Sequence, residues 1–258
     1  MTIQQIFKKK NNILIGMIHL SPLLSISGFE GIKKTTEKAL RDLLALQSAG
    51  FDGALIENEN DKPHTEFANP AQIANFTVIA QEVCKHAKIP VGVQIMLNDW
   101  KSSFSIAKVV GAKFTRLDVF VDHVSSRWGE IHPNPRKIIK YKKEIFPELL
   151  LLTDIQVKYK TMIVSRSLIA SARQAIAHES DGLIITGEAT GKETPLSKIQ
   201  EVRKAFPDFP IFVGAGIRKE NIREQLSVAN GAIVGTSIKT RGMIYVKKAK
   251  MLRRALNK

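Results

Sequence analysis

Short, mostly apolar segments alternate with longer amphipathic segments from one end of the chain to the other. The short segments are rich in β-branched residues and show little polar alternation, which is typical of parallel strands covered on both faces. Longer segments repeat apolar residues every three or four positions, as helices with one buried face do. The expected strands are Ile13–Ile18, Gly53–Glu57, Val91–Met96, Phe114–Phe120, Leu149–Ile155, Gly182–Thr186, Ile211–Gly214 and Gly231–Gly235.

Eight strand–helix cycles without a change of rhythm predict an α/β fold, a single parallel eight-stranded (β/α)8 barrel. The chain has 258 residues, close to the usual length of one such domain. We therefore expect one domain over residues 1–258, with 1–12 as a basic N-terminal extension. Gly50 and Gly111 are expected to end helices. An open, doubly wound sheet is the alternative architecture.

Polar residues stand at the ends of several of these strands, where a (β/α)8 barrel has its binding mouth. Glu57, Asp99, Asp118 and Asp154 follow successive strands, so they are candidates for acid–base catalysis, together with Lys158. The same carboxylates could hold a divalent cation such as Mg²⁺, although no metal ligand is assigned and no paired-histidine spacing indicates zinc. Salt bridges and helix caps are the structural alternative for each of them.

Glycines and hydroxyl residues close strands six to eight and predict a phosphate site. Glycine lets a backbone approach a ligand closely, whereas the alternative is that these glycines only form tight turns. Polar residues after strands one, two and four could complete the site. The candidate ligand-binding residues are Gly187, Thr190, Gly191, Gly214, Gly216, Gly235, Thr236, Ser237, His19, Asn58 and Arg116.

The charge of the chain widens the range of partners. Lysine and arginine number 39 against 24 aspartate and glutamate residues, a net charge of +15. Such a surplus suits a phosphorylated or polar small molecule, an anionic membrane surface or nucleic acid. Nucleic acid is the weakest of the three, because no recognition motif accompanies the charge. The oligomeric state stays open, with a homo-oligomer among the alternatives.

One cysteine, Cys84, and the lack of a secretory signal or a long apolar run favour a cytoplasmic location, with peripheral membrane attachment left open. Several motifs then resemble the BtpA/SgcQ family, in order from about residue 13 to 245. They are Ile15-Gly16-Met17-Ile18-His19-Leu20-Ser21-Pro22-Leu23, Gly53-Ala54-Leu55-Ile56-Glu57-Asn58, Pro90-Val91-Gly92-Val93-Gln94 with Asn98-Asp99, Thr186-Gly187-Glu188-Ala189-Thr190-Gly191 and Val234-Gly235-Thr236-Ser237-Ile238-Lys239.

The resemblance implies a phosphate-binding type of (β/α)8 barrel without fixing a reaction. Some members of that family are associated with photosystem I biogenesis and peripheral membrane attachment, and others are assigned as nucleosidases or sugar-metabolism proteins. Two functions therefore stay open: an enzyme acting on a phosphorylated sugar or nucleoside-like ligand, such as a nucleosidase, or a non-catalytic membrane factor. The chain departs from the family pattern at Ser125–Gly129 and at Tyr159, where we would expect histidine.

Overall fold

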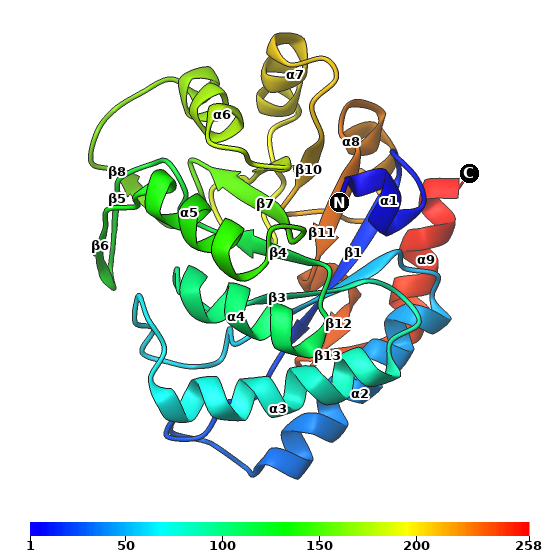
Figure 1. Cartoon of the computed structure of the whole chain (residues 1–258). Helices are drawn as coiled ribbons and strands as arrows, with labels where there is room; N and C mark the ends of the chain where they lie inside the picture. The colour runs from blue at the N-terminus through cyan, green and yellow to red at the C-terminus, as the bar shows by residue number, and fades with distance from the viewer. Residues whose placement is uncertain (258) are drawn as a thin grey trace.

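Eight parallel strands pair edge to edge into a closed barrel in this computed structural model, which describes residues 1–257 (Figure 1). Strand β1 pairs with both β2 and β11, so the sheet closes on itself and the open-sheet alternative is wrong. The order around the barrel is β1-β11-β10-β9-β7-β4-β3-β2. The strands are β1 (Ile13–His19), β2 (Gly53–Glu57), β3 (Val91–Gln94), β4 (Phe114–Leu117), β7 (Leu150–Ile155), β9 (Gly182–Ile185), β10 (Ile211–Val213) and β11 (Gly231–Val234).

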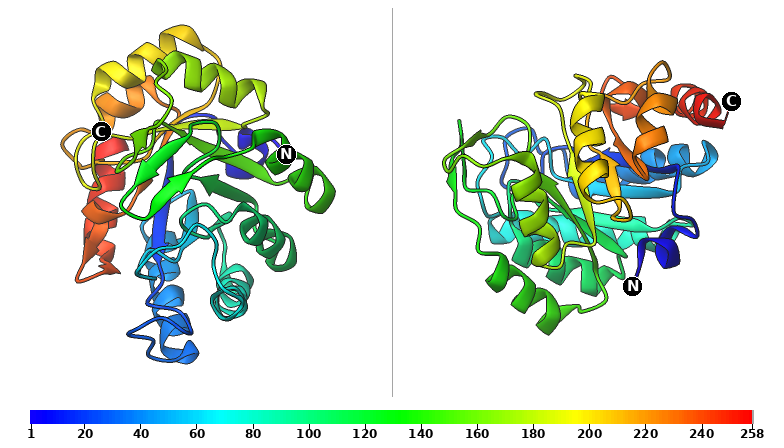
Figure 2. Two further views of the ribbon diagram at one scale, coloured as in Figure 1. Left: turned by 90° about the vertical axis from the view of Figure 1, so that its left-hand side faces the viewer. Right: turned by 90° about the horizontal axis from the view of Figure 1, so that it is seen from above.

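Helices follow the strands and surround the barrel, as both views in Figure 2 show. Two helices end where the sequence predicted, because Gly50 and Gly111 adopt positive φ just after α2 and α4. Asn69 caps α3 in a reciprocal pair with Gln72. The helices around the barrel are α2 (Ile32–Ser48), α3 (Pro70–His86), α4 (Trp100–Val110), α5 (Pro135–Ile145), α6 (Leu168–Ala177), α7 (Leu196–Ala205), α8 (Ile222–Val228) and α9 (Val246–Asn257).

All eight predicted strands are present, and β3 and β4 end earlier than predicted. Strand β3 stops at Gln94 because side chains bind the next backbone amides. The Ser103 hydroxyl accepts from the Ile95 N–H at 3.0 Å, and the Asn58 side-chain oxygen accepts from the Met96 N–H at 2.8 Å. These bonds replace a strand ladder and turn the chain over the mouth.

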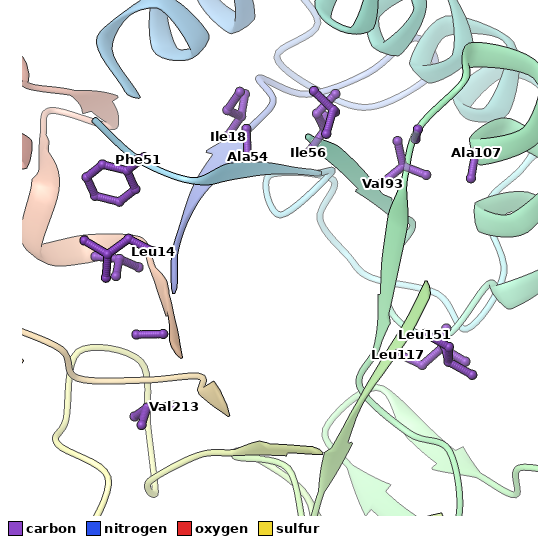
Figure 3. Close-up of a cluster of buried hydrophobic side chains, with 14 of the residues drawn as sticks. Leu14, Ile18, Phe51, Ala54, Ile56, Val93, Ala107, Leu117, Leu151 and Val213 are labelled. Atoms are coloured by element: carbon purple, nitrogen blue, oxygen red, sulfur yellow. The ribbon is translucent and has the colours of Figure 1, made fainter. Parts of the chain in front are cut away.

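Side chains alternate between two separate cores along each strand. Leu14 and Ile18 of β1 point outward and pack under the helices, with Ile56, Val93 and others in the cluster of Figure 3. Ile13, Ile15 and Met17 point inward and belong to a smaller core inside the barrel. Burial on both faces explains the continuous apolar runs that predicted the strands.

The N-terminal segment closes one end of the barrel interior. Residues 1–12 are expected to form a basic extension, but they contain the helix α1 (Ile3–Phe7), capped by Thr2. Ile3, Ile6 and Phe7 are buried in the inner core, and the Phe7 ring lies 5.4 Å from that of Phe114. The description as an extension therefore holds only for the lysines that follow, because the helix is part of the packed fold.

Small elements that the hydrophobic pattern did not predict lie over the opposite, carboxyl end of the strands. Strands β5 (Val124–Ser126), β6 (Gly129–Ile131) and β8 (Thr161–Met162) form an antiparallel sheet, here called the flap. The flap projects from the left of the barrel in Figure 1 and faces the viewer in the left view of Figure 2. The short helix η1 (Thr236–Ile238) and the hairpin of β12 (Lys239–Thr240) and β13 (Met243–Ile244) follow β11.

Candidate functional site

A layer of polar side chains tops the inner core of the barrel. Each of several strands places a polar residue two positions after an inward apolar one, and the strand period of two puts both on the same face. These pairs are Met17 and His19, Leu55 and Glu57, Phe114 and Arg116, Leu152 and Asp154, and Ile184 and Thr186. The alternation that fills the barrel therefore also aims these polar groups into its mouth.

A cavity of about 700 Å³ opens above this layer. Its volume lies within the range of small-molecule sites, roughly 300–1,000 Å³. The flap forms one wall through Ser126, Arg127 and Trp128. Of the predicted site residues, the cavity is lined by His19, Glu57, Arg116, Asp118, Lys158, Thr190, Gly191, Gly214, Gly216, Gly235, Thr236 and Ser237.

Arg116 and Asp154 form a buried ion pair beneath the cavity. The Arg116 Nε and Nη2 atoms donate to the two Asp154 carboxylate oxygens at 2.7 and 2.8 Å. Burial alone would lower the pKa of Arg116, but Asp154 and Asp118 outweigh burial and raise it. Asp154 does not line the cavity, so its carboxylate holds the guanidinium in place and is not free to act on a ligand.

Asp118 stays ionised in the cavity because cations surround it. Its carboxylate lies 3.5 Å from Arg116 Nε and 3.6 Å from Lys160 Nζ, and it accepts from the Gln94 amide at 2.9 Å. Burial would raise the pKa of this carboxyl, but Arg116 and the lysines Lys160 and Lys158 hold it well below its usual range. The site therefore has a fixed negative charge beside its cations.

The pKa of Glu57 is shifted in the opposite direction to that of Asp118. Burial, followed by the charge of Glu59 and, more weakly, that of Asp118, raises the pKa of Glu57 from 4.5 to about 8, although Arg116 opposes the shift. His19 lies 3.5 Å away, between His19 Nε2 and Glu57 Oε2. Burial, followed by the charges of Lys239 and Lys38, lowers the pKa of His19 well below 6.5. Near neutral pH both groups are uncharged, so this contact is a protonated carboxyl beside a neutral imidazole.

The glycines in the loops after β10 and β11 are present for different reasons. A Cβ at Gly216 would lie 2.1 Å from the Lys192 carbonyl oxygen, and one at Gly214 would lie 2.5 Å from Ile184. Both positions are explained by packing. At Gly235, the nearest atom to a Cβ would be Met17 Cβ at an ordinary 3.6 Å, so the fold has room for a side chain there. The free space at Gly235 opens into the cavity.

Two buried polar atoms beside Gly235 have no hydrogen-bond partner within residues 1–257. They are the Ser237 hydroxyl and the Lys239 ammonium nitrogen. Burial, together with Lys38, lowers the pKa of Lys239 to about 8, while Asp42 and Glu57 act against the shift. Unpaired buried donors are costly, and an anion bound to this loop would satisfy the Ser237 hydroxyl, which lines the cavity.

Residues 1–257 offer neither a ready metal site nor a membrane-spanning helix. They contain no cluster of three or more histidine, cysteine, aspartate or glutamate side chains that could hold a metal ion. Of the four carboxylates considered for a divalent cation, Asp154 pairs with Arg116, Asp118 lies beside Lys160 and Asp99 caps a helix, while Glu57 shares the cavity with Asp118. Over the same residues, no helix has the length and apolar character needed to cross a bilayer.

Comparison with known sequences then decides the family, since the sequence profile of the BtpA family matches residues 10–258. The chain belongs to the BtpA family. A BtpA relative from Synechocystis sp., named photosystem I biogenesis protein BtpA, is 31% identical over 91% of this chain and 83% of its own. SgcQ of Escherichia coli is 28% identical over 89% of this chain and 87% of its own. The predicted resemblance is confirmed.

The fold of this BtpA-family chain is also that of solved TIM barrels. The structure of N-(5′-phosphoribosyl)anthranilate isomerase from Pyrococcus furiosus superposes with a TM-score of 0.60 at 13% identity. The match covers 96% of this chain and 99% of the isomerase. At this level of identity the comparison establishes the barrel fold, which confirms the predicted fold class.

Three other predicted site residues lie outside the cavity lining. Asp99 caps α4, accepting from the Ser102 N–H and hydroxyl, and also accepts from the Ala68 N–H, so its carboxylate supports the loop. Asn58 donates to Asp61 at 3.0 Å and accepts from Met96. A Cβ at Gly187 would lie 2.7 Å from the Glu193 carbonyl oxygen, so packing explains that glycine. Each of the three is thus engaged within the fold and lies outside the cavity lining.

Sequence reasoning missed several side chains that line the cavity, namely Glu59, Lys62, His64, Trp128, Lys160 and Arg218. Most of them lie two to five residues after the predicted end of a strand, beyond the positions that we used to predict the mouth. Lys160 carried a usable signal, because it repeats the charge of Lys158 two positions later. Trp128 was noticed only as part of a loop that departs from the family pattern.

Proposed function

We propose that this BtpA-family barrel is an enzyme that binds a phosphorylated sugar in its mouth and cleaves a bond at the sugar by general acid catalysis. The observation that carries the proposal is a cavity lined by two carboxyl groups in opposite environments, since Asp118 lies 3.5 Å from Arg116 and 3.6 Å from Lys160 and Glu57 lies beside the imidazole of His19. Glu57 is protonated near neutral pH and Asp118 is ionised. Two carboxyl groups with opposite protonation are the usual arrangement for glycoside hydrolysis and related reactions.

The phosphate would bind the loop that follows β11. Gly235 leaves space there, and the Ser237 hydroxyl, which lines the cavity, is a buried donor without a partner among residues 1–257. Loops after strands seven and eight are a frequent phosphate site in this fold. The names of structural neighbours, such as the phosphoribosylanthranilate isomerase, support a phosphorylated ligand.

The chemistry would then use Glu57 as the proton donor. Its carboxyl group protonates the leaving group as the bond to the sugar carbon breaks, and the Asp118 carboxylate stabilises the positive charge that develops on the sugar. Water adds to the sugar carbon, and its proton returns to the Glu57 carboxylate. His19, 3.5 Å from Glu57, would hold that carboxyl group in position.

Thermal-shift measurements with inorganic phosphate, ribose 5-phosphate and ribose, each with and without Mg²⁺, test the binding step. A ligand that binds the folded state raises the melting temperature by mass action. We expect shifts with the two phosphates and none with ribose. Gly235→Trp should abolish the shift by filling the loop, whereas Gly235→Ala, with its ordinary contacts, should retain it. No shift with either phosphate would overturn the proposal.

A second candidate function is peripheral attachment to an anionic membrane. Helix α9 exposes Lys247, Lys250 and Arg254 together with Met251, which is 48% exposed. Basic and apolar side chains on one surface helix favour the membrane interface. The name of the Synechocystis relative is the reason to test it. Flotation with phosphatidylserine liposomes at low salt, lost in a Lys247→Glu/Lys250→Glu variant, would support it, and no flotation at low salt would exclude it.

A further inference from the structure

One wall of the cavity is apolar and aromatic. The flap covers a small hydrophobic cluster of Leu97, Val119, Val124, Ile131 and Val157, against which Met96 and Trp128 pack. Met96, Leu97 and Trp128 also line the cavity. Such a wall offers no hydrogen bonds to a phosphate or to the hydroxyl groups of a sugar, and it suits an apolar part of a ligand.

The Trp128 indole contacts two other cavity-lining groups. The His64 and Trp128 rings form a T-shaped pair, with ring centres 5.6 Å apart and an angle of 84° between their planes. The Arg127 guanidinium lies 4.4 Å from the centre of the indole ring. Burial lowers the pKa of His64, followed by the charge of Lys62, which keeps the imidazole uncharged at neutral pH. The three side chains form an ordered group of flat π systems.

The aromatic wall and the phosphate loop lie on opposite sides of the mouth. In the barrel order, β4 is four places away from β11, which is half of the circumference, and β3 is three places away from it. Met96 and Leu97 follow β3 and Trp128 follows β4, whereas Gly235 and Ser237 follow β11. Glu57 and Asp118 line the same cavity. A ligand that fills the mouth would therefore meet the proposed phosphate loop at one end and the apolar wall at the other.

We propose that the wall formed by Trp128, His64 and Met96 binds a flat heteroaromatic ring, so that the ligand is a phosphorylated sugar that carries such a ring, as a nucleoside monophosphate does. The inference rests on the proposed function, because it specifies the group attached to the phosphorylated sugar. Stacking of a base on an aromatic side chain is worth about 1–3 kcal/mol. Trp128 would thus determine specificity for the ring and leave the phosphate loop to bind the other end.

Isothermal titration calorimetry with ribose 5-phosphate and adenosine 5′-monophosphate separates the two ends. We expect the nucleotide to bind the unmodified chain at least about tenfold more tightly, the factor that ~1.4 kcal/mol of stacking supplies. Trp128→Leu should remove about that factor for the nucleotide and leave ribose 5-phosphate unchanged. Trp128→Phe keeps a flat ring and should retain most of the nucleotide affinity, which also controls for damage to the flap.

Fluorescence gives an independent readout, because the chain has only two tryptophans. Trp100 packs in α4 against Tyr141, 5.6 Å away between ring centres, and lies outside the cavity lining. In a Trp100→Phe variant, emission comes from Trp128 alone. Saturation with adenosine 5′-monophosphate should quench it, and saturation with ribose 5-phosphate should not.

The possible failures can be told apart. If ribose 5-phosphate binds and the nucleotide binds no more tightly, with Trp128→Leu unchanged, the ring site is refuted and the phosphate site stands. If neither ligand binds the unmodified chain, the proposed function and this inference both fail. Nucleotide binding that quenches Trp128 and is weakened by Trp128→Leu but not by Trp128→Phe would support the inference.

Discussion

Replacing Glu57 with glutamine should change how the stability of the fold depends on pH. The pKa of this carboxyl is raised from 4.5 to about 8, first by burial and then by the charge of Glu59. Between these values the folded chain holds a proton that the unfolded chain has released. The folded state therefore binds more protons, and the free energy of unfolding falls as pH rises through this window. Below pH 4.5 Glu57 is protonated in both states, so its ionisation does not lower the stability of the fold. Above about pH 8 it is ionised in both states, and the full loss of stability is present.

The size of the effect follows from the shift. Each pH unit inside the window removes about 1.4 kcal/mol of stability. Two units, from pH 5.5 to 7.5, therefore cost about 3 kcal/mol as an upper value, because neighbouring groups relax when Glu57 ionises. For a chain of this size that corresponds to roughly 6–12 °C in melting temperature. Glu57→Gln keeps the shape of the neutral side chain at every pH and should not lose this amount.

Melting temperatures of both proteins across this pH range measure the difference directly. The original chain should lose more stability than Glu57→Gln as the pH rises, and the variant should be the more stable of the two at pH 7.5. Glu188→Gln, at an exposed position of the loop after β9, removes a carboxyl without removing a buried one and serves as the control. Parallel pH profiles for the original chain and Glu57→Gln would show that Glu57 ionises freely, and the general acid assignment would then lose its basis.

Two other substitutions test the packing that shapes the mouth and the base of the barrel. Gly216→Ala places a Cβ 2.1 Å from a backbone oxygen at a φ of +70°, so it should lower the free energy of unfolding by more than about 2 kcal/mol. Gly235→Ala should lower it by less than about 1 kcal/mol. Equal losses of stability for the two variants in urea unfolding would contradict this expectation. Phe7→Ala removes a buried ring from the inner core and should cost about 3–5 kcal/mol, compared with less than about 0.5 kcal/mol for Phe67→Ala at a half-exposed position. If Phe7→Ala unfolds at the same urea concentration as Phe67→Ala, α1 does not contribute to the core.

The barrel could be predicted from the sequence because its physics is local and repeated. Each strand is an apolar run of a few residues, and each polar residue at its end keeps the strand period, as Leu55 and Glu57 do. Five-residue and three-residue elements such as α1 and β5 have no such pattern. Their stability comes from contacts with residues far away in the sequence, such as that of Phe7 with Phe114. A short stretch of sequence therefore cannot predict them.

The roles of the carboxylates were harder to predict than their positions. In a short βα loop, the end of a strand and the cap of the next helix occupy neighbouring positions. Asp99 was therefore a candidate catalyst by its place after β3, and the structure shows it as the cap of α4. Asp154 depends on register, because only the pairing of β4 with β7 brings it to Arg116. A strand-end carboxylate is thus a candidate catalyst only where it lines the cavity, as Glu57 and Asp118 do and Asp99 and Asp154 do not.

The closure of the barrel explains why the two ends of the mouth differ, and why a loop near the middle of the sequence acts with one near its end. A closed ring of eight strands places every strand opposite the one four places away, and here β4 faces β11 across the mouth. Trp128 and Ser237 are 109 positions apart in the sequence, yet they line one cavity. Strand count alone could have predicted that the loop after β4 faces the glycine loop. The strand count could not predict the flap, whose short strands turn Trp128 back over the mouth instead of out to solvent.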